Sequence, residues 1–316
     1  MPSPDDVRAA CETAAATMRT DSDHSEIAFF GGSFTAIPRE IMVSLLGAAA
    51  PYIKRGFFRG IRISTRPDAV DEAVLTLLKE YHVTAVELGA QSMDDGVLAA
   101  NFRGHTSADV THAAGLIKSS GLELGLQMMT GLYQSNNGTD YETARRLADL
   151  RPVTMRIYPT LVMEHTALAK LYRMGAYTPQ TLEQAVALCA GLLRFFEREN
   201  GIRVIRLGLH AGSEMQAGLV AGPWHPAFRE LCEGVLFYET ALDLLKMELP
   251  EGGRAALGVN PKAVSRMTGQ KRCNLIKLAQ AGYDVTVRAD PAVADGDIIL
   301  FSRLMGEQYL KNKGRV

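Results

Sequence analysis

The chain has 316 residues, of which 47% are hydrophobic and 22% charged, and its formal net charge is −1. This is the composition of a globular protein, long enough for one large α/β domain and a smaller module. A nearly neutral chain has no global attraction for nucleic acid or anionic lipid, and no apolar run approaches the roughly 18–20 residues of a membrane span, so we expect a cytoplasmic protein that does not bind membranes.

The predicted elements alternate between helices and strands along the first two thirds of the chain. A helix over 5–19 precedes a short apolar strand at 27–30, and a helix follows over 39–54. Five further strands are predicted at 61–64, 85–88, 122–126, 155–158 and 203–209, separated by helices over 71–81, 94–101, 107–119, 139–149 and 181–198. Six strands in this alternation predict a parallel α/β sheet wound in one direction, as in a full or partial barrel.

A glycine pair directly follows the first predicted strand. Gly31 and Gly32 have no Cβ, so a ligand could lie against the backbone there, and Ser33 and Thr35 add hydroxyl groups. A strand that ends in glycines before a helix is a common small-molecule site at the carboxyl edge of a parallel sheet. The alternative is a turn with a purely structural role.

Polar residues gather within or just after the predicted strands, where they would face the carboxyl end of a barrel lumen: Ser64, Thr65, Arg66, Glu87, Gln91, Ser92, Gln127 and Arg156. Glu87 and Arg156 fall inside strand patterns, where an unpaired charge would cost several kcal/mol by rough estimate. Either these two residues pair with each other in a packed core, or they face a ligand.

Beyond residue 212 the alternation stops. A connecting helical segment over 213–253 ends in a Glu-Leu-Pro-Glu-Gly-Gly linker, and a small module follows over 254–316. Its predicted strand, two helices and strand resemble a minimal KH module, which clamps single-stranded RNA in a GxxG loop. Here the loop is Gly269-Gln270-Lys271-Arg272, so that arginine replaces the second glycine, although Lys271 and Arg272 could still contact RNA phosphates. The alternative is a small cap on the barrel edge.

Five motifs occur in an order that resembles the radical S-adenosylmethionine (SAM) superfamily, and most closely its Elp3-like branch, over roughly residues 1–210. They are Gly-Gly-Ser-Phe-Thr (31–35), Ser-Thr-Arg-Pro-Asp (64–68), Val-Glu-Leu-Gly-Ala-Gln-Ser (86–92), Arg-Gly-His-Thr (103–106) and Ile-Tyr-Pro-Thr-Leu-Val (157–162). The best-known members of this branch modify the wobble uridine of tRNA. The resemblance implies a TIM-like (β/α)6 barrel over residues 1–212 that lacks its first strand.

The resemblance also implies a SAM site, with the backbone at Gly31-Gly32-Ser33 holding the methionine amino group. Polar groups near the ribose and carboxylate would come from Gln91 and Ser92, and Gln127 and Arg156 would lie beside the ribose and adenine. The full set of implied cofactor-binding residues is Gly31, Gly32, Ser33, Thr35, Arg66, Gln91, Ser92, Gln127 and Arg156. No catalytic residue is implied, and His105 is either a loop residue with a structural hydrogen bond or a residue with a family role.

Radical SAM enzymes hold a four-iron, four-sulfur (4Fe-4S) cluster on a CxxxCxxC triplet, because thiolates are the ligands that such clusters need. The four cysteines of this chain are scattered and form no such triplet: Cys11, Cys189, Cys232 and Cys273. We therefore predict no metal ligand within the chain. Either the cluster segment lies upstream of a misassigned start or in a broken gene, or the chain is a clusterless descendant.

Three functional hypotheses follow. The first is a radical SAM enzyme that, once the cluster segment is present, cleaves SAM to a 5′-deoxyadenosyl radical and abstracts hydrogen from a substrate, for which the resemblance suggests RNA such as tRNA. The second is a clusterless RNA-binding or regulatory protein that uses the loop at 269–272. The third is a degenerate fragment without a stable fold. The sequence identifies neither the substrate nor the oligomeric state.

Overall fold

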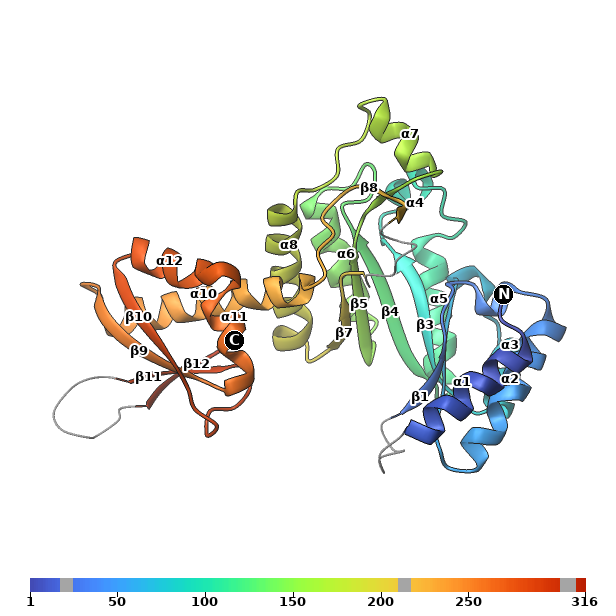
Figure 1. Ribbon diagram of the computed structural model, residues 1–316. Coiled ribbons are helices and arrows are strands. Elements are labelled where there is room, and N and C mark those ends of the chain that lie inside the picture. The colour runs from blue at the N-terminus through green and yellow to red at the C-terminus, as the bar shows by residue number, and fades with distance from the viewer. Residues whose placement is uncertain (18–24, 210–216, 302–310) are drawn as a thin grey trace. The chain divides into compact units, whose positions relative to one another are not determined.

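The computed structural model describes residues 1–17, 25–209, 217–301 and 311–316. The chain forms two compact units (Figure 1). The barrel unit consists of Met1–Pro179 and Phe196–Arg206, and the C-terminal unit consists of Gln180–Phe195 and Leu207–Val316.

The barrel unit is built on a six-stranded sheet with the order β1-β2-β3-β4-β5-β7. Adjacent strands from β1 to β5 pair in parallel, as the alternation with helices predicts. The strands are β1 (Glu26–Phe29), β2 (Gly60–Thr65), β3 (Val83–Gln91), β4 (Glu123–Thr130), β5 (Thr154–Pro159) and β7 (Arg203–Leu207). The predicted partial barrel is confirmed, since the sheet curls into a half-barrel.

The curl is evident from a contact between the two sides of the sheet. In a flat sheet, strands four positions apart would be separated by roughly 19 Å, at about 4.8 Å per strand. Nevertheless Arg156 of β5 has its guanidinium carbon 4.5 Å from the ring centroid of Phe30, which directly follows β1. The two side chains therefore meet across the lumen.

Helices cover the outer face of this sheet, and α2, α3, α5 and α6 each pack on a strand (Figure 1). The helices of the barrel unit are α1 (Pro4–Thr17), α2 (Arg39–Lys54), α3 (Glu72–Glu80), α4 (Asp95–Ala100), α5 (Ser107–Ser119), α6 (Asn137–Asp149) and α7 (Ala167–Arg173), and a short strand β6 spans Val162–Met163. Side-chain caps mark where α3, α4, α5, α6 and α7 begin. Thr106 before α5 and Asn136 before α6 each form a reciprocal capping box that satisfies the first free N–H groups.

Side chains of the strands alternate between the helices and the lumen. On β4, Leu124 and Leu126 are buried in the apolar core, whereas Gly125 between them faces the lumen. A Cβ there would lie 2.8 Å from Cγ of Glu87 and 2.9 Å from Oγ1 of Thr154, so only glycine leaves room for the Glu87 side chain.

The C-terminal unit contains the small α/β module that the sequence predicts after residue 254. Its sheet has the order β10-β9-β11-β12, in which β9 and β10 are parallel and β11 is antiparallel to both of its neighbours. The predicted order of strand, two helices and strand is present, whereas β11 and β12 were not predicted. The elements of this unit are α8 (Leu182–Arg194), β8 (Leu219–Ala221), α10 (Phe228–Glu248), β9 (Gly253–Val259), α11 (Val264–Thr268), α12 (Cys273–Gln280), β10 (Tyr283–Ala289), β11 (Asp297–Phe301) and β12 (Lys311–Arg315).

A buried asparagine joins the helices of this module. The amide of Asn274 on α12 donates to the carbonyl oxygens of Gly234 at 2.8 Å and Arg266 at 3.0 Å. Gly269 begins the predicted loop with φ +72°, and a Cβ there would lie 2.6 Å from Sγ of Cys273 and 2.9 Å from Cγ of Asn274. The first glycine of the loop is thus required by helix packing.

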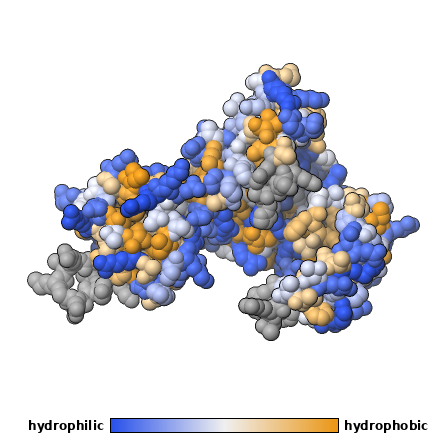
Figure 2. Space-filling model, in the orientation of Figure 1, coloured by the Kyte–Doolittle hydropathy of each residue, from blue (hydrophilic) through white to orange (hydrophobic). Residues whose placement is uncertain are grey.

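No helix in the described part of the chain has the length and apolarity needed to cross a bilayer. The face of the molecule drawn in Figure 2 mixes hydrophilic residues with separate apolar patches. Such a mixture is the usual surface of a globular protein.

Candidate functional site

Three of the predicted site residues lie on neighbouring strands: Gln91 ends β3, Gln127 lies in the second half of β4, and Arg156 lies in the middle of β5. In the sheet register Gln127 of β4 stands beside Gly89 of β3 on one side and beside Arg156 of β5 on the other. The amide Nε2 of Gln127 lies 3.5 Å from Oε1 of Gln91, at the end of β3. The two glutamines and Arg156 therefore line one edge of the lumen.

The glycine pair lies at the end of β1, at the same edge of the sheet. An ideal Cβ built on Gly31 or Gly32 would meet no atom within 4 Å, so both backbones border open space. Gly32 has φ +74°, which L-residues rarely adopt. The preceding residue, Phe30, contacts Arg156 across the lumen, and this contact connects the glycine pair to the edge that holds the glutamines.

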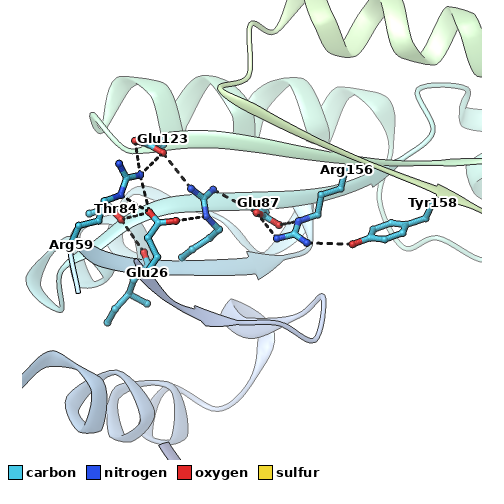
Figure 3. Close-up of polar contacts among 9 residues, drawn as sticks. Glu26, Arg59, Thr84, Glu87, Glu123, Arg156 and Tyr158 are labelled. Atoms are coloured by element: carbon cyan, nitrogen blue, oxygen red, sulfur yellow. Dashed lines mark hydrogen bonds and ion pairs between the residues drawn. The ribbon is translucent and has the colours of Figure 1, made fainter. Parts of the chain in front are cut away.

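Glu87 and Arg156 form an ion pair with each other, which is the first of the two alternatives that the sequence left open (Figure 3). Nε of Arg156 lies 2.6 Å from Oε2 of Glu87, and Nη2 donates to Oε1 at 3.1 Å. The third nitrogen, Nη1, lies 3.5 Å from the hydroxyl of Tyr158. Burial alone would lower the pKa of Arg156, but the bonds to Glu87 raise it above its ordinary value. Arg156 is therefore a fixed cation whose nitrogens already have partners.

The ion pair continues into a network that spans the five strands from β1 to β5 (Figure 3). Arg62 of β2 is 6% exposed at its side chain and contacts three carboxylates, those of Glu87 at 3.5 Å, Glu26 at 2.8 Å and Glu123 at 3.4 Å. Arg59, which directly precedes β2, forms ion pairs with Glu26 and Glu123. Burial by itself would raise the pKa of Glu26, but hydrogen bonds from Arg62 and Arg59 hold it below the ordinary value. The three arginines and three glutamates balance in charge.

Several other predicted residues are hydrogen-bonded within the chain. The Thr35 hydroxyl lies 2.6 Å from that of Thr65, and the Ser92 hydroxyl lies 3.2 Å from that of Thr143. Further side chains of the motifs are engaged as well: the Arg66 guanidinium pairs with Asp68, and Nε2 of buried His105 lies 3.0 Å from the carbonyl oxygen of Ala90. Ser33 precedes a short 3-10 turn and makes no capping bond with its side chain. These residues shape the loops around the strand ends.

Sequence reasoning missed one buried acid beside this edge. Asp140 of α6 is 3% exposed and accepts hydrogen bonds from the N–H of Gly131 and the hydroxyl of Ser135, each at 2.9 Å, which fixes the loop that leaves β4. Burial raises the pKa of Asp140 to about 6, although both hydrogen bonds oppose the shift. Tyr177 donates to the Gly131 carbonyl at 2.7 Å. In the sequence Asp140 looks like an ordinary acid in the first turn of a helix, so no signal distinguishes it.

The residues present do not fit a 4Fe-4S cluster. Each of the four cysteines lies on a different helix, α1, α8, α10 or α12, and none follows a strand of the barrel. Burial raises the thiol pKa of Cys11 and of Cys232, which disfavours the thiolate that binds iron. Within the described residues no three His, Cys, Asp or Glu side chains form a group that could hold a metal ion.

The residues that the family resemblance implies for SAM binding suit SAM better than the cysteines suit a 4Fe-4S cluster. The glycine pair offers backbone to open space, and two glutamine amides at the same edge can donate and accept hydrogen bonds. These are the neutral polar groups that suit an amino group and ribose hydroxyls.

Two family models match the chain. The model of the radical SAM superfamily matches residues 8–147, and that of the radical SAM C-terminal domain matches residues 152–236. Together these segments make up more than half of the 316 residues.

Curated relatives agree with the family models. A tRNA uridine(34) acetyltransferase from Methanocaldococcus jannaschii is 33% identical over 129 residues, which are 40% of this chain and 24% of that protein. The human Elongator complex protein 3 is 30% identical over 191 residues, 54% of this chain and 35% of that protein. The chain thus spans about a quarter to a third of the length of these relatives.

A solved structure, that of the Methanocaldococcus infernus Elp3 with an N-terminal deletion, has the same fold. Its TM-score is 0.64 at 24% identity, and the match covers 76% of this chain and 62% of that one. The matches of the family models, the order of the motifs and the half-barrel agree, and the chain belongs to the radical SAM superfamily as an Elp3-like member.

Proposed function

We propose that the barrel unit binds SAM at the carboxyl ends of β1–β5, and that the protein is a radical SAM enzyme that acts on RNA. The observation that carries this proposal is the placement of the open glycine pair and of the Gln91–Gln127 contact at one edge of the lumen. RNA is favoured as the substrate class because a relative is named for tRNA uridine.

Each part of the edge has a role in this proposal. The backbone at Gly31 and Gly32 accepts hydrogen bonds from the methionine amino group, since no side chain keeps the ligand away. Gln91 and Gln127 bind the ribose hydroxyls with their amides. Arg156 lies beside the adenine of SAM and keeps its position, because its nitrogens are already engaged by Glu87 and Tyr158.

SAM supplies an electrophilic sulfonium joined to a nucleoside. Its reductive cleavage needs a 4Fe-4S cluster, and the cysteines of this chain do not provide the ligands. We therefore assign to these residues the binding of SAM and of the substrate, and no step of the cleavage. Cluster ligands for that reaction would come from outside residues 1–316.

Substitution of Gly32 tests the SAM site. A methyl group at Gly32 would occupy the space where the ligand meets the backbone, so Gly32→Ala should weaken SAM binding tenfold or more in calorimetric titrations. The matched control is Gly56→Ala. Gly56 has a similar φ of +76° and equally open surroundings, but it lies in the loop before β2, at the opposite end of the strands. If both variants bind SAM as the wild type does, or if the wild type binds none, this site is refuted.

A second candidate function is RNA binding through the loop at Gly269, Gln270, Lys271 and Arg272. Lys271 and Arg272 are both exposed, with φ +52° and +61°, and neither takes part in an ion pair among the described residues. Exposed cations without carboxylate partners can contact phosphates.

Filter binding of tRNA tests this second function. Replacing both Lys271 and Arg272 with alanine should weaken tRNA binding. It should also reduce the slope of log affinity against log salt concentration by the amount that corresponds to about two phosphate contacts. Arg254→Ala is the control, because Arg254 belongs to the same module and is exposed, but it pairs with Asp284. Equal tRNA affinity of the double variant and the wild type would exclude a role for this loop.

A further inference from the structure

Arg103 is a cation at the ligand edge of the barrel that has no carboxylate partner among the described residues. Its Nη2 lies 3.3 Å from Sδ of Met129 on β4, and a thioether is only a weak hydrogen-bond acceptor. Part of the residue is exposed, yet burial lowers the pKa of Arg103, and no carboxylate opposes that shift. By contrast, Arg66 and Arg156 at the same edge each pair with a carboxylate. Arg103 is therefore partly desolvated without a counter-charge, which is unfavourable until an anion binds.

Met129 places this guanidinium over the lumen. Met128 of β4 is fully buried in the core, so Gln127 and Met129 on either side of it face the lumen. Two residues along a strand span about 7 Å, so Arg103 meets the strand one layer of side chains beyond Gln127, toward its carboxyl end. A ligand bound beside Gln127 would therefore have Arg103 on its open side.

The loop that carries Arg103 is fixed on both flanks of this residue. Nε2 of buried His105 lies 3.0 Å from the carbonyl oxygen of Ala90, near the end of β3. On the other flank, the amide of Asn101 donates to the carbonyl oxygen of Tyr133, in the loop after β4, at 2.9 Å. These contacts hold the loop over the ends of two neighbouring strands, and a preorganised cation loses little entropy when it binds a ligand.

The SAM site proposed above contains no unpaired cation among its described residues. Its groups are a glycine backbone and two glutamine amides, all of them neutral. Ser92, which the family resemblance places near the carboxylate of SAM, is only 4% exposed, and its hydroxyl meets that of Thr143 and accepts from the N–H of Asp94. An anionic group of a ligand at this edge thus still lacks a partner of opposite charge.

We propose that Arg103 is an anion-binding residue whose guanidinium binds an oxyanion of a ligand in the lumen. A guanidinium forms charge-assisted and often bidentate hydrogen bonds with carboxylates and phosphates alike. The proposal rests on the proposed function, in which two ligands of this edge carry such groups. SAM has one carboxylate, and RNA has a phosphate at each nucleotide, so the test uses ligands that separate these two sources.

The first arm of the test concerns the SAM carboxylate. Arg103→Met removes the charge and keeps an apolar side chain, and decarboxylated SAM retains the amino group and the sulfonium but has no carboxylate. If the oxyanion is this carboxylate, Arg103→Met should bind SAM at least tenfold more weakly than the wild type in calorimetric titrations of the full chain. Decarboxylated SAM should then bind both proteins equally. Equal weakening for both ligands would mean that the substitution disturbs the lumen, and would overturn the proposal.

The second arm concerns an RNA phosphate and uses labelled tRNA, with binding followed by fluorescence anisotropy at several salt concentrations. If the oxyanion belongs to RNA, Arg103→Met should bind tRNA at least fivefold more weakly and SAM as the wild type does. The slope of log affinity against log salt concentration should fall by the amount that corresponds to about one phosphate contact. Unchanged affinity for both SAM and tRNA would overturn the proposal.

Arg55→Met is the matched control. Arg55 also has no carboxylate partner among the described residues, and its guanidinium carbon lies 4.5 Å from the ring centroid of Tyr52, but it follows α2 at the opposite end of the strands. This variant should bind SAM and tRNA as the wild type does. Arg103→Met should unfold in urea at no lower concentration than the wild type, because it removes an unpaired cation. A loss of stability with unchanged affinities would assign Arg103 to packing instead.

Two further variants complete the test. Arg103→Gln also removes the charge and should show the same losses, so it replaces Arg103→Met if that variant does not fold, whereas Arg103→Lys keeps the charge and should recover part of the affinity. Binding of neither ligand by the wild type would refute the proposed function and this proposal together. Normal wild-type binding that the uncharged variants retain would refute the role of Arg103 alone.

Discussion

Glu87→Gln is expected to destabilise the barrel unit by about 3 kcal/mol or more, because it removes the carboxylate between two arginines. Arg62 and Arg156 would then keep their charges, with side chains only 6% and 15% exposed, and would lose a partner. Breaking a buried ion pair by removing one member typically costs about 3–5 kcal/mol. Urea unfolding monitored by circular dichroism measures the loss.

The matched control is Glu164→Gln. Glu164 pairs with Arg173 at 2.6 Å, but both side chains are well exposed, at 39% and 54%, so this change should cost less than about 1 kcal/mol. Arg156→Met combined with Glu87→Gln should recover part of the loss, since the uncompensated charge disappears. Equal stability of the Glu87 and Glu164 variants would mean that the lumen network does not support the sheet.

Asp140 is expected to make the wild type less stable as the pH rises. Its folded-state pKa of about 6 lies above the ordinary value of 3.8, so the folded state holds the proton more tightly than the unfolded state does. Below about pH 4 both states are protonated and there is no penalty. Between about pH 4 and pH 6 the unfolded state ionises while the folded state keeps its proton, so the free energy of unfolding falls, and above pH 6 the loss is complete. A pKa difference of about 2, at about 1.36 kcal/mol per pKa unit, amounts to roughly 3 kcal/mol.

Asp140→Asn should remove this pH dependence, because the amide stays neutral. The stability of the variant relative to the wild type should therefore increase by about 3 kcal/mol between pH 4 and pH 8, as measured by urea unfolding at each pH. Asp149→Asn on the same helix is the control, since Asp149 is exposed and the decline should persist in that variant. A constant difference between Asp140→Asn and the wild type across this range would contradict burial as the cause.

Much of the barrel could be predicted from local patterns. The helices α2 and α5 begin and end at the predicted residues, because each has an apolar stripe and a clear terminal signal. β2 and β3 were recognisable because parallel strands buried on both faces read as short apolar runs. The apolar run of β1 suggested the same burial, but β1 is the edge strand of the sheet and is only partly buried. Glu87 and Arg156 stood out as charges inside such runs, and their pairing was one of the two alternatives considered.

Some of the features that were missed depend on contacts between distant parts of the chain. The contact between Phe30 and Arg156 exists because the sheet curls, and the hydroxyl of Ser92 meets that of Thr143, 51 residues away. The pKa of Asp140 is raised because its side chain is buried, and the polar sequence around it gives no sign of that burial. β11 was missed although residues 298–301 are a short apolar run of the kind that marks a buried strand, whereas the polar β12 has no such run and is defined by its pairing with β11.

A crystal structure of this protein with SAM would test the central claim most directly. The expected result is density for SAM at the carboxyl ends of the strands, with its amino group against the backbone of Gly31 and Gly32 and its ribose beside Gln91 and Gln127. Density for SAM at any other place, or a lumen without the ligand at saturating SAM, would contradict the account.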